Sequence, residues 1–278
     1  MFVLSRLAAF LRSIEAGERR VLRLRERVVI IPTVDTLGLS NHARIGKDHP
    51  PSTKAVNEAV MALTQAAYYR VNVCAANSDI EEMPQVLLYA PNDDERASAC
   101  LFGLPAVVER PIDSDEAGEL MRAWRPHRGE NFVIRAGQSG NLQTQHCEIL
   151  FRALVAFLNR TRIIDGLQLV EGEEDLHYFS RRQACDVRAE QPGIFASCLE
   201  VGRWVRVGDD LGQIYDGFTG DIRMRVIAPV AGLLAGLRRE PLLCAGDLVA
   251  RILTLDVAFR RGAAWRRPKG KHYERQTG

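Results

Sequence analysis

The fold of the second half of the chain is decided by residues 193–252, GIFASCLEVGRWVRVGDDLGQIYDGFTGDIRMRVIAPVAGLLAGLRREPLLCAGDLVARI. Short apolar runs alternate there with Gly-Asp, Asp-Gly and Pro turns, a composition typical of a small all-β module. The segment VGRWVRVGDDLGQI at 201–214 is echoed by REPLLCAGDLVARI at 239–252, with a spacing of 38 between their Gly-Asp turns. The sequence therefore predicts an internal β repeat.

That repeat resembles the compact, barrel-like modules of biotinyl and lipoyl carriers, in which two similar halves meet at a hairpin that bears the modified lysine. The chain has no lysine between Lys54 and Lys269. A carrier domain with a covalently attached cofactor is therefore excluded. A small, all-β, barrel-like domain remains the expectation for this half of the chain.

The first half alternates between helical and strand-like patterns, which is the signature of an α/β domain. We expect helices over 3–16, 54–69, 92–103, 113–124 and 142–159, and strands over 27–34, around 71–73, and over 84–91, 105–111 and 130–137. The pattern changes near residue 166. We therefore expect an α/β domain over 1–165, a β domain over 166–256 that folds independently, and a disordered basic tail over 257–278.

Composition narrows the classes of partner. The formal net charge is +2 over 278 residues and no basic patch marks the body of the chain, so nucleic acid is not an expected partner. No apolar run approaches the roughly 20 residues of a membrane span. The six cysteines stand apart with no C-x-x-C pair, which favours reduced thiols in a cytoplasmic protein.

Three stretches carry a resemblance to a known family. They are RERVVIIPTVDTLGLSNHAR at 25–44, ENFVIRAGQSG at 130–140 and the β segment at 193–252. Together they resemble the succinylglutamate desuccinylase and aspartoacylase family from about residue 3 to 253. The resemblance implies a carboxypeptidase-like α/β domain, incomplete at its N-terminus because the chain begins within the helix that follows the family's first metal motif, and then a small β domain.

The same resemblance implies a chemistry. In that family one zinc ion is held by a G-x-H-G-x-E motif and a later histidine, and the metal activates a water molecule. A glutamate on the last strand of the α/β domain serves as general base. The implied reaction is hydrolysis of the amide bond of N-acyl amino acids or related small molecules, so the implied partner is a small N-acyl amino acid or carboxylate.

This sequence departs from the family pattern at each catalytic position. It contains no G-x-H-G-x-E. Cys74 stands where the resemblance places the later histidine ligand, and Arg135 stands where it places the general-base glutamate. Arg44 is the candidate for binding a substrate carboxylate, in a segment shorter than the family's. A cysteine at a strand end is also an ordinary small buried hydrophobe, and His42, Asp48, His49, His127 and His146 show no spacing that converges on it.

Two functions remain open at this point. The first is a zinc deacylase by descent that is inactive in this chain, with zinc not retained. The second is a non-catalytic relative that keeps the fold for binding or assembly. Homo-oligomer formation is compatible with both.

Overall fold

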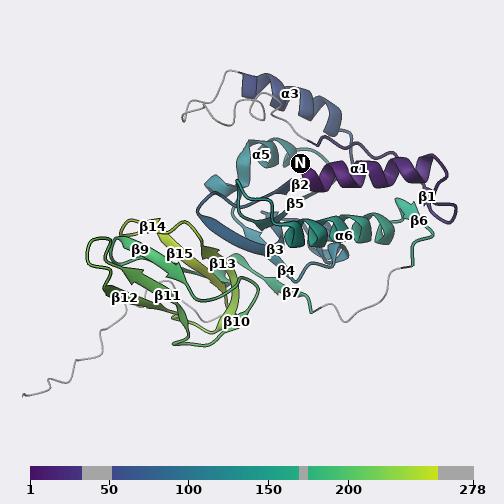
Figure 1. Cartoon of the computed structure of the whole chain (residues 1–278). Coiled ribbons are helices and arrows are strands. Elements are labelled where there is room, and N and C mark those ends of the chain that lie inside the picture. The colour runs from purple at the N-terminus through teal and green to yellow at the C-terminus, as the bar shows by residue number, and fades with distance from the viewer. Residues whose placement is uncertain (33–51, 169–174, 256–278) are drawn as a thin grey trace, which may run out of the picture.

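The computed structural model describes residues 1–32, 52–168 and 175–255, and Figure 1 shows their arrangement. The α-helices are α1 (Phe2–Glu15), α3 (Ser52–Thr64), α4 (Asp93–Ser98), α5 (Gly118–Trp124) and α6 (Thr144–Arg160). Short 3₁₀ helices are η1 (Ala99–Phe102), η2 (Asp115–Ala117) and η3 (Arg181–Gln183). The tail at 257–278, expected to be disordered, lies outside the described residues.

The strands of the described residues fall into three sheets. The first half of the chain contributes β1 (Arg23–Leu24), β2 (Tyr69–Cys74), β3 (Ile80–Tyr89), β4 (Ala106–Arg110), β5 (Glu130–Gly137) and β6 (Ile164–Asp165). The second half contributes β7 (His177–Phe179), β8 (Ala184–Arg188), β9 (Gly193–Ser197), β10 (Trp204–Val205), β11 (Asp210–Tyr215), β12 (Ile222–Ile227), β13 (Gly232–Arg238), β14 (Leu242–Leu243) and β15 (Leu248–Leu253). A mixed α/β fold with large sheets results, as the sequence predicts.

The largest sheet crosses the boundary expected near residue 166. Its strand order is β2-β5-β3-β13-β15-β8, with β4 beside β3, β7 beside β4, and β10 beside β13. Strand β3 is the junction. It pairs in parallel with β4, antiparallel with β5, and antiparallel with β13 through Gly236↔Glu82 and Leu237↔Glu81. The two halves of the chain therefore share one hydrogen-bonded sheet.

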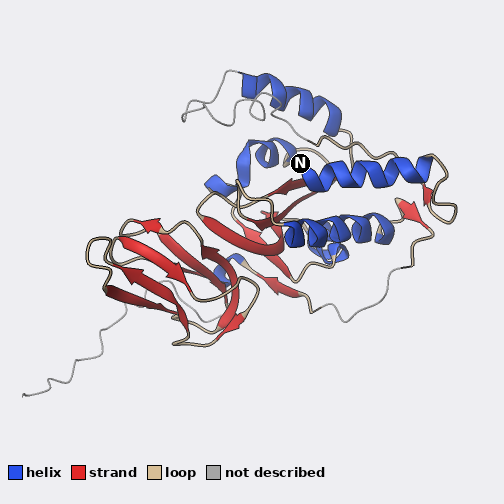
Figure 2. Ribbon diagram, in the orientation of Figure 1, coloured by secondary structure: helices blue, strands red, loops and turns tan. Residues whose placement is uncertain are grey.

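One face of this sheet is covered by α1 and α6, which lie side by side in Figure 2. Each helix has an apolar stripe at helical spacing that turns toward the sheet. The α1 stripe is Val3, Leu7, Leu11 and Ile14, and the α6 stripe is Leu150, Ala153, Leu154 and Phe157. They pack with Val86, Leu88, Phe132 and Ile134 of β3 and β5. Burial of this shared apolar surface stabilises the helical layer.

The opposite face is covered by α5. Met121 and Trp124 of α5 pack on Met83, Leu87 and Val133 of the sheet. The same cluster contains Leu233 and Ala235 of β13 and Leu253 of β15. The hydrophobic core on this face is thus common to both halves of the chain, as the sheet is.

The second half forms two packed β layers. The sheet β12-β11-β9-β14 lies against the part of the large sheet made by β13, β15 and β8, and Figure 1 shows the two layers. Phe195, Leu211 and Ile214 from one layer share a buried cluster with Leu234 and Ile252 from the other. The described strands do not close on themselves, so the expectation of a barrel-like domain is not confirmed. The pairing of β13 with β3 is one reason, since it opens the module toward the first half.

The predicted internal repeat is confirmed at its turns. Gly208 and Gly246 both have φ +90, a conformation that glycine adopts without steric cost. In each turn the following residue, Asp209 or Asp247, accepts a hydrogen bond from the amide three residues before it, at 2.7 and 2.8 Å. Each turn is also held by a pair of backbone hydrogen bonds to Ala228 or to Ala189, respectively.

The prediction of a strand over 27–34 is wrong for the residues that the structure describes. Residues 27–32 carry no strand, and 33–34 lie outside the described residues. Val28 and Ile30 pack as partly buried side chains against the core beneath α1 and α6. Their β-branched side chains are thus buried without a partner strand, and β-propensity alone does not make a strand.

The other elements follow the predicted order. The helix expected over 54–69 ends at Thr64, because strand β2 begins at Tyr69. The element expected over 92–103 is α4 followed by η1, and it ends at Gly103 with φ +64. Among the described helices, none combines the length and apolar character that a membrane crossing requires.

Candidate functional site

The candidate site begins with two neighbouring strands. In the parallel pair β2 and β5, Cys74 is the register partner of Arg135. The sequence resemblance implies that these are the positions of the family's later zinc ligand and general base, and the structure brings the two residues side by side. Their proximity contributes to raising the pKa of Arg135 above its ordinary value. Their functional roles stay predictions.

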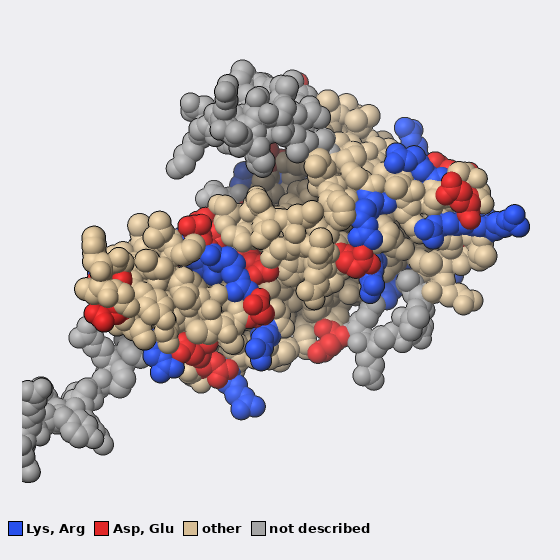
Figure 3. Space-filling model, viewed as in Figure 1, with Lys and Arg blue, Asp and Glu red and all other residues tan. Residues whose placement is uncertain are grey.

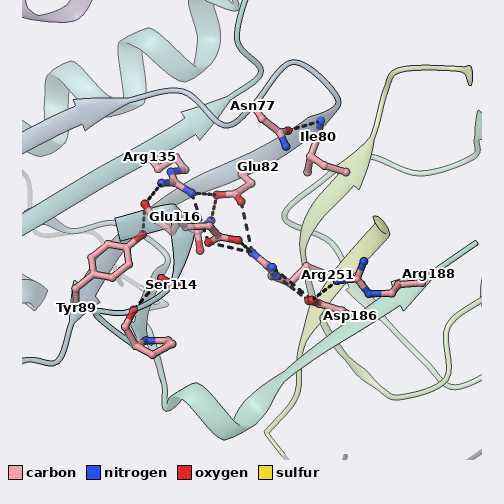
Figure 4. A network of polar contacts seen from close by, with 12 residues as sticks. Asn77, Ile80, Glu82, Tyr89, Ser114, Glu116, Arg135, Asp186, Arg188 and Arg251 are labelled. Carbon is pink, nitrogen blue, oxygen red and sulfur yellow. Dashed lines mark hydrogen bonds and ion pairs between the residues drawn. The ribbon is translucent and has the colours of Figure 1, made fainter. Parts of the chain in front are cut away.

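Arg135 belongs to a cluster that we call the arginine–carboxylate network, made of Glu82, Glu116, Arg135, Asp186 and Arg251 (Figure 4). The Nη1 atom of Arg135 lies 3.8 Å from Glu82 Oε2 and 3.7 Å from Glu116 Oε2. Its Nη2 donates to the backbone oxygen of Glu116 at 3.3 Å. Arg135 is thereby held between two carboxylates.

Arg251 extends the network into the second half of the chain. It sits on β15, and its Nη1 lies 3.1 Å from Glu116 Oε1 and 3.8 Å from Glu82 Oε1. On its other side, Nε donates to Asp186 Oδ1 at 2.8 Å. Asp186 is its register partner on β8. One arginine thus joins carboxylates from β3, from η2 and from β8.

The burial of these charges makes their pairing necessary. The side chains of Glu82, Arg135 and Arg251 are 8%, 11% and 10% exposed. Taking charged groups out of water costs several kcal/mol each unless opposite charges and hydrogen bonds compensate. Three carboxylates and two arginines in mutual contact provide that compensation.

The pKa shifts of Glu116 and Arg135 also arise from burial and from the neighbouring opposite charges. Burial raises the pKa of the Glu116 carboxyl, but the charges of Arg251, Arg110 and Arg135 outweigh burial, and the pKa lies below its ordinary value. Burial likewise disfavours the charged form of Arg135, yet Cys74 and Glu82 raise its pKa above the ordinary value. Both groups are therefore charged at neutral pH.

Tyr89 closes the network toward β3. Burial raises the pKa of its hydroxyl to about 12, so the phenol is neutral at pH 7. The hydroxyl donates to the backbone oxygen of Glu116 at 2.9 Å. This bond and the one from Arg135 fix the backbone of η2 over the sheet.

A second polar cluster lies on the other face of β3. Glu81 contacts His146 Nε2 at 2.9 Å, Gln143 Nε2 at 2.6 Å and Arg239 Nε at 2.6 Å. Successive side chains of a strand point to opposite faces of the sheet. Adjacent Glu81 and Glu82 of β3 therefore belong to two separate clusters.

The remaining predicted residues do not join Cys74. Arg44, the candidate for substrate carboxylate binding, lies outside the described residues, as do His42, Asp48 and His49. His127 is exposed at the end of α5, and His146 contacts Glu81. No histidine of the described segments is therefore placed beside Cys74 by a contact.

The residues that the structure describes do not assemble a zinc centre around Cys74. Within the described part of the chain, no three His, Cys, Asp or Glu side chains are grouped to hold a metal ion. Cys74 is the register partner of Arg135, whose permanently charged guanidinium would repel a divalent cation. Glu82 and Glu116 are engaged by the same arginine and by Arg251.

Glu82, Glu116, Asp186 and Arg251 are not predicted as site residues from the sequence. A signal for two of them exists in the pattern. Glu82 and Arg251 each stand within a strand whose other residues are almost all buried. Charged residues in such strands are paired, because an unpaired buried charge is too costly.

Comparisons with known proteins place the fold. No protein-family model matches the chain, and a search of curated proteins finds no match. Among solved structures, succinylglutamate desuccinylase/aspartoacylase from Rhodobacter sphaeroides superposes with a TM-score of 0.66 and 17% identity, covering 87% of this chain and 80% of that one. An aspartoacylase family protein from Mesorhizobium loti gives 0.54 and 14% identity over 72% and 67% of the two chains.

A third solved structure is the product-bound ectoine utilization protein EutE (DoeB) from Ruegeria pomeroyi. It gives a TM-score of 0.61 with 20% identity, covering 74% of this chain. The chain spans only 64% of the length of that protein. At such identities the likeness establishes the fold, and it confirms the resemblance found in the sequence at that level. The chain has the fold of the succinylglutamate desuccinylase and aspartoacylase proteins.

Proposed function

We propose that this chain is a non-hydrolytic relative of the zinc deacylases, which keeps their fold to bind a small molecule or a partner and does not cleave amides. The observation that carries the proposal is the state of Arg135. The sequence resemblance implies that Arg135 stands at the family's general-base position, and in the structure it is paired with Glu82 and Glu116.

A guanidinium at this position works against amide hydrolysis in two ways. It stays protonated at any physiological pH, so it has no lone pair with which to accept a proton from water. It also places a positive charge against Cys74, where the fold relatives would need a metal ligand. Both effects depend on residues inside the chain, whatever precedes Met1.

The network also has a structural role that a deacylase centre would not need. Arg251 of β15 reaches Glu116 of η2, and so connects the second half of the chain to the layer above the first half. Replacement of a catalytic centre by such a connection supports a binding or scaffold role. The domain division at residue 166 is part of this proposal, with the network as the link between the two units.

Two measurements on the full-length chain test the proposal. The first is zinc content after incubation with excess zinc and gel filtration, by elemental analysis. The second is amine release from N-acetyl-aspartate and N-succinyl-glutamate with zinc present. We expect far less than one zinc per chain, and amine release no faster than from the matched variants Cys74→Ala and Arg135→Gln.

One tightly held zinc per chain, with amine release that disappears in Cys74→Ala, would overturn the proposal. It would show that a cysteine-containing zinc centre has replaced the family's centre. Zinc binding that survives in Cys74→Ala and supports amide cleavage would overturn it as well, by placing the centre elsewhere in the chain.

A further inference from the structure

We propose that the outer face of the four-stranded sheet β12-β11-β9-β14 is an interface at which two copies of this chain associate about a two-fold axis. This sheet is the outer layer of the second half of the chain, at the end of the molecule away from α1 and α6 (Figure 1). The inference goes beyond the proposed function, which concerns the arginine–carboxylate network. It is carried by a row of exposed apolar side chains.

The row of apolar side chains crosses the sheet from edge to edge. Leu242 of β14 is the register partner of Ile194 on β9, and Ile194 is also the partner of Tyr215 on β11. Side chains directly opposite one another on neighbouring strands share a face of the sheet. Ile222, aligned with Tyr215 at a register shift, extends the row to β12. We call these four residues, with Phe218 of the turn between β11 and β12, the apolar stripe.

The apolar stripe lies on the face that the hydrophobic core does not use. The exposed fractions are 66% for Leu242, 54% for Ile222 and 99% for Phe218. Phe195 and Ile214, the chain neighbours of Ile194 and Tyr215, point the other way into the buried cluster between the two β layers. Single exposed apolar residues are ordinary, but a contiguous apolar patch marks an interaction surface.

The turn that carries Phe218 is held in one conformation. Asp216 Oδ1 accepts hydrogen bonds from the backbone amides of Phe218 at 2.7 Å and Thr219 at 3.1 Å. A Cβ atom built on Gly217 would lie 3.7 Å from Ile194 Cδ1, so the turn starts against the rest of the apolar stripe. Because the turn is already ordered, burying the exposed ring in a contact costs little conformational entropy.

The charges beside the apolar stripe favour a second copy as the partner. Arg223 donates to Asp216 Oδ2 through Nε at 2.8 Å. Arg225 donates to Asp210 Oδ2 through Nε at 3.0 Å. Both arginines of β12 are thus neutralised within their own sheet. Their charges therefore neither select an acidic partner nor repel a second copy of the same face.

The symmetry of a two-fold contact sets a further requirement, which the apolar stripe meets. Such a contact places the same patch on both sides, so the patch has to be complementary to itself. Apolar side chains satisfy this condition with one another. The hydroxyl of Tyr215 donates to Gln213 Oε1 at 2.7 Å, so its ring can be covered without leaving an unpaired donor.

The first experiment measures association of the full-length chain by sedimentation equilibrium over a range of concentrations. We expect a reversible dimer. Phe218→Ser should weaken dimerisation at least about tenfold, because an aromatic anchor is lost. The matched control is Leu63→Ser, since Leu63 is a 59% exposed apolar residue on α3 in the first half of the chain, and it should dimerise as the parent does.

A second experiment separates association of two like faces from unspecific adhesion. Ile194 is central in the apolar stripe, so Ile194→Glu and Ile194→Lys should each dimerise at least about tenfold more weakly, because like charges meet across the contact. An equimolar mixture of the two variants should recover dimers. Ile194 is partly exposed, so dilute samples should melt at the parent temperature, which shows that the fold is kept.

Three outcomes would overturn the inference. They are a chain that stays monomeric at all concentrations, dimerisation unchanged by Phe218→Ser, and a mixture of the Ile194 variants that does not recover. In the first case the apolar stripe would belong to a different partner. Association is measured without zinc or substrate, so none of these results bears on whether the chain hydrolyses amides.

Discussion

At the scale of single residues, Arg135 is the centre of the arginine–carboxylate network. The family resemblance implies a proton acceptor at this position, and this chain has a buried cation there. Its position could be taken from the sequence only through the family resemblance, since ENFVIRAG by itself predicts a buried strand. Its partners could not be found in this way, because Glu82, Glu116 and Arg251 are brought to it by pairings between distant segments.

Removing the charge of Arg135 should destabilise the protein. Arg135→Gln leaves Glu82 and Glu116 with less compensation in a buried place, and we expect a loss of about 3 kcal/mol in the free energy of unfolding. Arg135→Glu should cost more, because it brings a third negative charge against the other two. Urea unfolding monitored by circular dichroism measures both values.

The control for this prediction is Arg188→Gln, which should change the unfolding free energy by less than about 0.5 kcal/mol because that side chain is 57% exposed. An Arg135→Glu protein as stable as the parent would show that the network does not hold charge in the way described.

At the scale of elements, the sequence predicted the α/β alternation well because its signals are local. The start of α4 is one example. Asn92 and Glu95 form a capping box, with Glu95 N donating to Asn92 Oδ1 at 2.8 Å and Asn92 N donating to Glu95 Oε2 at 2.9 Å. Such spacing is visible in the sequence. The strand expected at 27–34 failed because its β-branched residues say nothing about whether a partner strand is present.

Glu95 has a further role that the capping box does not reveal. Its side chain is fully buried, and its carboxylate binds Arg125 Nη1 at 2.8 Å and accepts from the backbone amide of Asn131 at 2.8 Å. It therefore joins α4 to the end of α5 and to β5.

We expect Glu95→Ala to lower the free energy of unfolding by about 3 to 5 kcal/mol, since it leaves Arg125 and the Asn131 amide without their acceptor. Asp93→Ala in the same helical turn is the matched control, because the Asp93 side chain is 99% exposed, and it should cost less than about 1 kcal/mol. Chemical denaturation of the two variants makes the comparison. Equal losses would mean that Glu95 acts only as a helix cap.

At the scale of the whole molecule, the visible surface carries charges of both signs. On the face drawn in Figure 3, acidic and basic side chains are interspersed over both halves of the chain. This agrees with the low formal net charge of +2. The organisation that the sequence did not predict is the shared sheet, because the pairing of β3 with β13 joins segments more than 150 residues apart.

The shared core gives a prediction for the second half alone. A fragment over 166–256 keeps the buried cluster between its own two β layers, so we expect it to fold. It should also self-associate, because Leu233, Ala235 and Leu253 lose their cover and β13 gains a free edge. Light scattering at rising concentration measures the association.

The variant Ala235→Glu should act differently in the isolated fragment and in the full-length chain. In the fragment the added charge lies on the uncovered face and should reduce association. In the full-length chain Ala235 is 0% exposed, so an unpaired carboxylate there should lower the melting temperature by many degrees. A fragment that stays monomeric at high concentration would show that the uncovered face of Leu233, Ala235 and Leu253 does not drive association. A fragment without a cooperative melt would show that the domain boundary lies elsewhere than residue 166.

Strand β3 also limits how this architecture can be recombined. Its first residues pair with β13, its last residues pair with β4, and Arg239 beside β13 binds Glu81 at 2.6 Å. A chimera that exchanges only residues 166–256 with a relative would join a foreign β13 to the native start of β3. Exchange of the C-terminal half between homologues should therefore succeed only when residues 80–82 are inherited together with it.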